Sequence, residues 1–178
     1  MADQPRSVIT YRVTFVLLVA AVMFAQLLPL RPGPGGIPGP DIILLIALAW
    51  IAMRPDYVPV LLLAVVFLIL DLLLMRPPGL WTALAVLAGE FLRGRQAQLR
   101  AASFPTEWAL IAGIIVAMTL ANVVILAIFG VAQPSLGLTL LRLIFTILCY
   151  PLVVILAGRA FGIRKVRAGD QDRFGQRS

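Results

Sequence analysis

Two charged side chains inside apolar runs are the residues best placed to do chemistry. Asp71 lies four residues before the end of the run 57–75, and Arg142 lies six residues after the start of the run 136–161. An ionisable group in a membrane-spanning helix is costly unless it is paired or hydrated, so it marks a substrate site, a proton relay or a structural ion pair. At ~1.5 Å of rise per residue, Asp71 and Arg142 lie roughly 6 and 9 Å below the same membrane surface. We therefore expect an ion pair that latches two helices together, with a substrate or proton site as the alternative.

A third polar group, the amide of Asn122, lies in the middle of the apolar run 108–130. An amide at that depth needs hydrogen-bond partners, which a neighbouring helix commonly supplies. The same run carries small residues every four positions, a spacing that lets two helix backbones approach closely: Ala109, Gly113, Ala117 and Ala121. This pattern predicts a helix-contact face, either inside one bundle or with a partner protein.

Pro151 interrupts the last apolar run. Because proline has no amide hydrogen, it leaves the carbonyl of Ile147 without its usual helical donor and predicts a kink. Glu90, nearer a predicted membrane surface, is spaced to pair with Arg93 three residues later. We expect both features to be structural.

The residues needed for most catalytic sites are missing from the sequence. It has no histidine and a single cysteine, Cys149, which excludes a serine or cysteine nucleophile activated by histidine. It also has no phosphate-binding glycine loop and no paired carboxylates at helical spacing for a metal. The polar segment 93–107 has three arginines and one glutamate, enough to hold lipid headgroups but thin for catalysis. We therefore expect a protein that is not an enzyme and has neither a cofactor nor a metal site.

The elements that must position these residues are membrane helices. The chain has 178 residues, of which 61% are hydrophobic and 13% are charged; soluble proteins have about 45–50% and about 25%. One soluble core of this size cannot bury so much apolar surface. The net charge of +7 comes from basic residues that flank the apolar runs, which indicates membrane orientation rather than nucleic-acid binding.

Apolar runs separated by helix breakers predict an all-α integral membrane protein with about six transmembrane helices, in a single domain of residues 1–161. The second and fourth spans are short, so they either cross the membrane with help from their neighbours or re-enter from one side. Pro and Gly fill eight of the nine positions from 32 to 40, which must form a loop. The predicted spans are residues 11–30, 41–53, 57–75, 79–92, 108–130 and 136–161.

Lys and Arg predict the orientation, because they concentrate on the cytoplasmic side of a membrane. With six spans and a cytoplasmic N-terminus, twelve basic residues fall inside and two fall outside. A five-span chain that lacks the second span and has its N-terminus outside places eleven inside and three outside. Both arrangements put the C-terminus, a basic and disordered tail of residues 162–178, in the cytoplasm, and we prefer six spans.

The stretch FLILDLLLMRPPGLWTALAVLAGEFLRGR resembles the central signature of the MreD family, the rod-shape-determining inner-membrane proteins of bacteria. Chain length, number of spans, a Pro-containing loop after the first span and a basic tail also agree with this family. Members often carry a glycine several residues before the acidic position, which this chain lacks. The residues at the signature positions are Asp71, Leu72, Gly79 and Leu80, with Phe91 and Leu92 where members often carry an aromatic residue followed by Leu.

The resemblance implies a non-enzymatic scaffold of the elongasome, located in the bacterial cell inner membrane. Members associate with MreC, a single-span protein, and help couple MreB filaments to RodA and its penicillin-binding transpeptidase during peptidoglycan synthesis, which maintains the rod shape of the cell. The family fold is thought similar to the six-helix substrate-binding subunits of energy-coupling-factor transporters. Membrane lipids, and not nucleic acid, are the other expected partners.

The residues leave one alternative function open. A small membrane transporter, or a vitamin-binding transporter subunit, would need a polar or aromatic-lined pocket. The side chains that could line such a pocket are Asp71, Arg142, Asn122 and Tyr150.

Overall fold

The computed structural model describes residues 5–28 and 38–161, and within these two ranges the regular structure is entirely helical. The predicted tail, residues 162–178, and most of the Pro/Gly loop lie outside the described residues. The elements in chain order are α1 (Pro5–Leu27), α2 (Ile42–Met53), the 3-10 turn η1 (Pro55–Tyr57), α3 (Val60–Leu73), α4 (Leu80–Gly94), α5 (Gln96–Ala101), α6 (Phe104–Ile128) and α7 (Leu136–Phe161).

The length and composition of the helices confirm an all-α membrane protein. Three segments are long and apolar enough to cross a membrane: Val8–Leu27, Phe104–Ile128 and Leu136–Arg159. The other main helices are short, with 12 residues in α2, 14 in α3 and 15 in α4.

The helix within the predicted span of residues 57–75 is shorter than that span, from Val60 to Leu73. Pro59 occupies the N-cap position, and the chain before it forms the separate turn η1, so α3 begins only at Val60. Proline supplies no amide hydrogen and favours the first turn of a helix, which explains the late start. At the other end α3 stops at Leu73, and Met75 has a left-handed backbone with φ of 51°.

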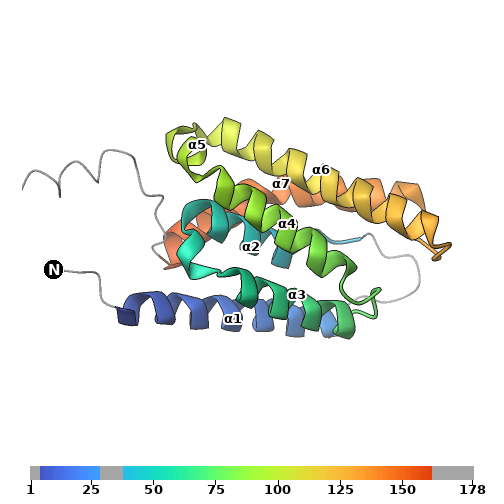
Figure 1. Cartoon of the computed structure of the whole chain (residues 1–178), viewed down its shortest axis with the longest axis horizontal. Helices are drawn as coiled ribbons and strands as arrows, with labels where there is room; N and C mark the ends of the chain where they lie inside the picture. Colours follow the sequence, from blue (N-terminus) through green and yellow to red (C-terminus); the bar gives the residue numbers. More distant parts are fainter. Residues whose placement is uncertain (1–4, 29–37, 162–178) are drawn as a thin grey trace, which may run out of the picture.

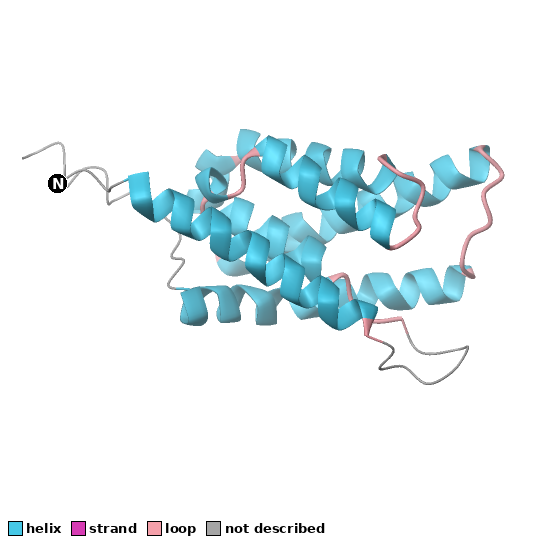
Figure 2. Ribbon diagram, turned by 90° about the horizontal axis from the view of Figure 1, so that it is seen from below, coloured by secondary structure: helices cyan, strands magenta, loops and turns pink. Residues whose placement is uncertain are grey.

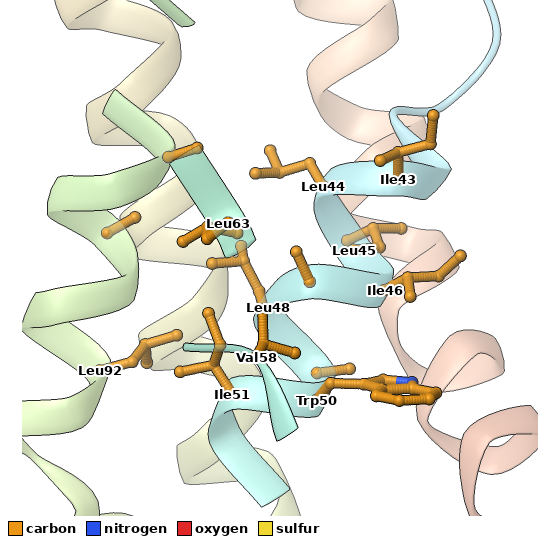
Figure 3. Packing of buried hydrophobic residues seen from close by; sticks show 14 of the residues in the cluster. Ile43, Leu44, Leu45, Ile46, Leu48, Trp50, Ile51, Val58, Leu63 and Leu92 are labelled. Atoms are coloured by element: carbon orange, nitrogen blue, oxygen red, sulfur yellow. The ribbon is translucent and has the colours of Figure 1, made fainter. Parts of the chain in front are cut away.

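Helix α2 lies at the centre of the molecule and is buried along almost its whole length. Eleven of its twelve residues are buried, and it contacts α1, η1, α4 and α7 (Figure 1). A helix that is apolar on every side is stable only where protein or lipid surrounds it. In Figure 3, Leu48 and Ile51 lie on the side of α2 that faces Leu63 of α3 and Leu92 of α4.

The remaining helices surround α2. The antiparallel pair α6 and α7 lies along one side and α1 along the opposite side, with α3 and α4 packed together between them (Figure 1). The second view, Figure 2, shows the helices running roughly lengthwise, with the loops gathered at the two ends. We call these the Asp41 end, which contains residues 38–41, 74–79 and 129–135, and the α5 end, which contains η1, α5 and the first turn of α6.

Candidate functional site

Asp71 forms a structural joint between α3 and α4. Its side chain is fully buried, and its Oδ2 accepts hydrogen bonds from the amide of Gly79 at 3.1 Å, the amide of Thr82 at 3.1 Å and the hydroxyl of Thr82 at 2.8 Å. These amides belong to the first turn of α4, which has no intrahelical acceptors. The carboxylate of Asp71 therefore caps α4 from the neighbouring helix.

Gly79 is required by the backbone of this joint. It is the N-cap of α4 and has φ of 89°, in the left-handed region that side chains with a Cβ rarely adopt. Two residues of the MreD-like signature, Asp71 and Gly79, thus meet in one hydrogen bond. The sequence reading singled out both residues but assigned them no contact with each other.

The end of α3 directs the next side chain, Arg76, toward the same region. The amide of Arg76 donates to the carbonyl of Asp71 at 2.9 Å, and the amide of Met75 donates to Leu72 at 3.4 Å. This pair of bonds, with Met75 in the left-handed conformation, is a Schellman motif, in which glycine is the usual residue. The Gly130 turn after α6 has the same pattern with glycine in place.

The predicted ion pair between Asp71 and Arg142 is wrong, because Arg142 pairs with Asp41. The Nη2 atom of Arg142 lies 2.9 Å from Oδ2 of Asp41, and Nη1 of Arg76 lies 3.9 Å from the same oxygen. The carboxylate of Asp71 instead faces the first turn of α4. The estimate of depth correctly placed Asp71 and Arg142 at the same end of the bundle, but depth alone does not determine which side chains meet.

Asp41 is a site residue that the sequence reading missed. Its Oδ1 accepts from the amide of Leu44 at 3.2 Å and caps α2. Its own amide donates to Oγ1 of Thr146 at 3.0 Å, and that hydroxyl donates to the carbonyl of Arg142 at 2.7 Å. An aspartate between a Pro/Gly loop and an apolar run is a recognised N-cap signal that could have identified it.

These residues line a cavity of about 620 Å³ at the Asp41 end. Arg142 and Asn122, both candidates from the sequence, line it together, whereas Asp71 and Tyr150 lie outside it. The polar lining comes from Asp41, Arg76, Trp81, Thr119, Asn122, Gln133, Thr139, Arg142 and Thr146, and the apolar lining includes Leu44, Leu80, Ile115, Leu126, Leu138 and Leu143.

The guanidinium of Arg76 is the group at this cavity whose protonation is most affected by its surroundings. Burial lowers its pKa from the ordinary value, while the neighbouring carboxylate of Asp41 opposes that shift. An arginine remains protonated in proteins even after such a shift. The cavity therefore has two permanent cations in its lining, Arg76 and Arg142.

Two polar contacts join α6 to α7 in the half of the bundle nearer the α5 end. The buried hydroxyl of Tyr150 donates to Oε1 of Glu107 at 2.8 Å, and the indole of Trp108 donates to the carbonyl of Ile147 at 3.0 Å. Ile147 is the carbonyl that Pro151 leaves without a helical donor, so Trp108 replaces the missing amide. The sequence reading placed Glu107 in a polar loop; the residue is buried because α6 begins earlier, at Phe104.

The small-residue pattern on α6 faces away from the bundle over most of its length. Ala109, Gly113 and Ala117 are exposed, whereas Ala121 packs partly against the core. A Cβ added at Gly113 would meet nothing within 4 Å. This face is therefore free of contacts with the described part of the chain.

Comparison with protein-family models, with curated proteins and with solved structures finds no match for this chain. Among the described residues, no group of three or more His, Cys, Asp or Glu side chains is placed to hold a metal ion. The features of the molecule that bear on its function are the cavity, the joint at Asp71 and the exposed face of α6.

Proposed function

We propose that this chain is a non-enzymatic membrane scaffold of the MreD type. In this proposal it lies in the bacterial inner membrane, binds an MreC-like single-span protein and helps couple MreB filaments to RodA and its penicillin-binding transpeptidase. The proposal takes the partners from the sequence resemblance and the contact surface from the fold.

The observation that carries the proposal is the exposed small-residue face of α6. Ala109, Gly113 and Ala117 leave a shallow surface along one side of a helix that is long enough to cross a membrane. Small residues stabilise helix pairs in lipid because the backbones can approach closely and pack over a large area. A partner with one transmembrane helix, such as MreC, fits a face of this shape.

The joint at Asp71 supports the same function. A signature residue that caps a neighbouring helix fixes the relative positions of α3 and α4, and its fully buried carboxylate is turned away from the cavity. A scaffold needs a fixed shape, so a structural role for the most distinctive acidic residue agrees with that function.

The distribution of arginines supports the proposed orientation. Arg76 and Arg142 lie at the Asp41 end, while many more arginines gather at the other end. Basic residues favour the cytoplasmic side, so we place the α5 end and the N-terminus in the cytoplasm. The arginines of the α5 end are Arg12, Arg54, Arg93, Arg95, Arg100 and Arg159.

The experiment is co-purification of the tagged chain with MreC from native membranes in a mild detergent. Ala117→Leu enlarges the exposed face of α6, and Ala20→Leu makes the same change at an exposed position of α1. We expect Ala117→Leu to reduce recovery of MreC about tenfold, because a contact loss of about 1.4 kcal/mol corresponds to that ratio. Ala20→Leu should recover MreC as the unmodified chain does.

Equal recovery of MreC by both variants would exclude α6 as the contact. Failure of the unmodified chain to recover MreC, RodA or the transpeptidase would count against the scaffold itself. Gly113→Leu provides an independent test of the same face, since a Cβ added at Gly113 meets nothing within 4 Å in the described part of the chain.

The cavity favours a second candidate, a small transporter or a vitamin-binding transporter subunit. Its volume lies within the range of about 300–1,000 Å³ that is common for small-molecule sites. Recovery of an ATPase module, or of a tightly held small ligand without any cell-wall protein, would favour this candidate over the scaffold.

A further inference from the structure

The cavity at the Asp41 end contains hydrogen-bond donors that the described residues do not use. A guanidinium has five N–H donors. The side chain of Arg142 donates a hydrogen bond to Asp41 and is 41% exposed. Arg76 lies 3.9 Å from Asp41, beyond hydrogen-bond distance, with its guanidinium 5.7 Å from the ring centre of Trp81. Most of these N–H groups are therefore available to a ligand.

Two neutral donors add to this set. The indole nitrogen of Trp81 is buried and has no hydrogen-bond partner among the described residues. The side-chain amide of Asn122 likewise makes no hydrogen bond within residues 5–28 and 38–161. A buried donor without an acceptor is costly, and such groups are rare in native structures unless a water or ligand satisfies them.

The other polar groups in the lining already have partners. The hydroxyls of Thr119, Thr139 and Thr146 donate to backbone carbonyls, and so does the amide of Gln133. The groups left over are thus mainly donors, from Arg76, Arg142, Trp81 and Asn122. A donor-rich site binds an acceptor-rich ligand.

The charges point to an anion. Asp41 is the carboxylate in the lining, and it faces two guanidinium groups. The second nearby carboxylate, Asp71, binds the first turn of α4 through its Oδ2, as Asp41 binds the first turn of α2 through its Oδ1. Each helix N-terminus contributes roughly half a positive charge. The two carboxylates are therefore about half offset by the helices that they cap, and the two guanidinium charges outweigh the negative charge that remains.

We infer that this cavity binds a phosphate group carried on an apolar body, with the phosphate between Arg76 and Arg142 and the apolar part along α6 and α7. Arginines suit phosphate because their planar forks bind its oxygens through paired hydrogen bonds. A carboxylate has two oxygens and could satisfy fewer of the donors than a phosphate. Leu126, Leu138 and Leu143 provide the apolar walls.

Such a phosphate can come from a lipid headgroup or from a water-soluble phosphate ester, and one experiment distinguishes the two. The full-length chain is purified in an uncharged detergent and incubated with phosphatidylglycerol or phosphatidylcholine. Native mass spectrometry then counts the lipids retained. A parallel series adds glycerol 3-phosphate as a soluble competitor. We expect phosphatidylglycerol to be retained at least about tenfold more strongly than phosphatidylcholine, because only the former adds a net negative charge.

Two variants and a matched control tie this binding to the cavity. Arg76→Gln and Asn122→Ala each remove donors from the lining and leave the hydrogen bond between Arg142 and Asp41 in place. Each should reduce retention of phosphatidylglycerol, with a loss of about tenfold for Arg76→Gln. Arg95→Gln removes the same charge from an exposed position at the α5 end and should leave retention unchanged.

The possible outcomes identify the source of the phosphate or overturn the inference. Competition by glycerol 3-phosphate identifies a soluble phosphate ester as the ligand, and retention of lipid without competition identifies a headgroup. Equal retention of the two lipids, or equal retention by Arg76→Gln and Arg95→Gln, would overturn the inference. The assay uses the purified chain without partners, so its failure would leave the scaffold proposal untouched.

Discussion

The two ends of the bundle use arginine in opposite ways. At the α5 end, Arg93 donates to Glu90 and to the carbonyl of Val58, and Arg12 donates to the carbonyl of Asp56 at 3.1 Å. Both guanidinium groups thereby connect helices to the turn η1. At the Asp41 end the guanidinium groups face a cavity and share one carboxylate.

The helices α6 and α7 show the same contrast. Toward the α5 end they are joined by the Glu107–Tyr150 and Trp108–Ile147 hydrogen bonds. Toward the Asp41 end, side chains of both helices line the cavity. One sequence has thus built one end in which Arg12 and Arg93 bind carbonyl and carboxylate groups, and a hollow end, in which donors are left over. The difference makes the Asp41 end, rather than the α5 end, the place where a ligand would find unused donors.

The largest expected effect on stability comes from removing the side chain of Asp71, which joins α3 to α4 at the hollow end. Asp71→Ala leaves the two amides and the hydroxyl that it binds without an acceptor in a buried place. We expect the free energy of unfolding to fall by about 3 kcal/mol, because hydrogen bonds to a charged group contribute about 1.5–3 kcal/mol each and partly compensate one another when lost. Unfolding by dodecyl sulfate in mixed micelles measures this, with insertion into membranes intact.

Two controls accompany that measurement. Asp56→Ala changes an exposed carboxylate at the α5 end and should alter stability by less than about 0.5 kcal/mol. Asp71→Asn retains an acceptor oxygen, so its free energy of unfolding should fall by less than that of Asp71→Ala. If Asp71→Ala were as stable as Asp56→Ala, the joint would have no structural importance.

A double-mutant cycle tests which aspartate pairs with Arg142. Asp41→Asn combined with Arg142→Gln should show a coupling of about 1 kcal/mol, the upper part of the range for a half-exposed pair with good geometry. The same cycle with Asp71→Asn should show a coupling within about 0.3 kcal/mol of zero. A larger coupling for Asp71 than for Asp41 would restore the pairing that we have rejected.

The contact between α6 and α7 is tested by replacing its donor. Trp108→Phe removes the indole N–H that binds the carbonyl of Ile147, and should cost about 1 kcal/mol. Pro151→Ala returns a backbone amide to this carbonyl. In that background the cost of Trp108→Phe should fall to less than half, as measured by unfolding in the same micelles. An unchanged cost would mean that the indole does not substitute for the amide.

The smallest effect concerns the turn that positions Arg76. Met75 is 93% exposed and has a left-handed backbone, so Met75→Gly relieves strain without removing packing. We expect a gain of about 0.5 kcal/mol in stability, since the greater freedom of glycine in the unfolded chain offsets part of the relief. Gly130→Ala, at the corresponding position after α6, should destabilise by about 1 kcal/mol. If both variants raised the free energy of unfolding, or both lowered it, the result would contradict this explanation.

The fold class could be predicted from the sequence, and most of the contacts in the site could not. Apolar composition and helix breakers were sufficient for a helical membrane protein. They could not distinguish α2 as a central buried helix from a short span facing lipid, because an apolar helix suits both surroundings. The direction of the α6 face was undecided for a similar reason: Ala109, Gly113 and Ala117 would look the same on an inner or an outer surface.

The ion pair of Arg142 and the burial of Glu107 show why the contacts in the site could not be predicted from the sequence. Counting residues along helices gives depth but not azimuth, so the depth match between Asp71 and Arg142 could not show that the two side chains face each other. The partner of Arg142 depends on which helix packs beside α7, and that helix is α2. Glu107 resembled a loop residue until the early start of α6 placed it in a helix facing Tyr150.

The contacts of Asp41 also set an order of events during synthesis. They join residues that are 105 and 101 positions apart in the chain, so Asp41 gains these two contacts only after the last helix has emerged. At ~1.5 Å per residue α2 extends roughly 18 Å, well short of the hydrocarbon thickness of about 30 Å. Before α7 emerges, α2 is too short to span the bilayer alone, and the amide and carboxylate of Asp41 lack their partners on α7. The final helix therefore completes the packing around α2, and a nascent chain that stops before Arg142 lacks the contacts that tie the start of α2 to α7.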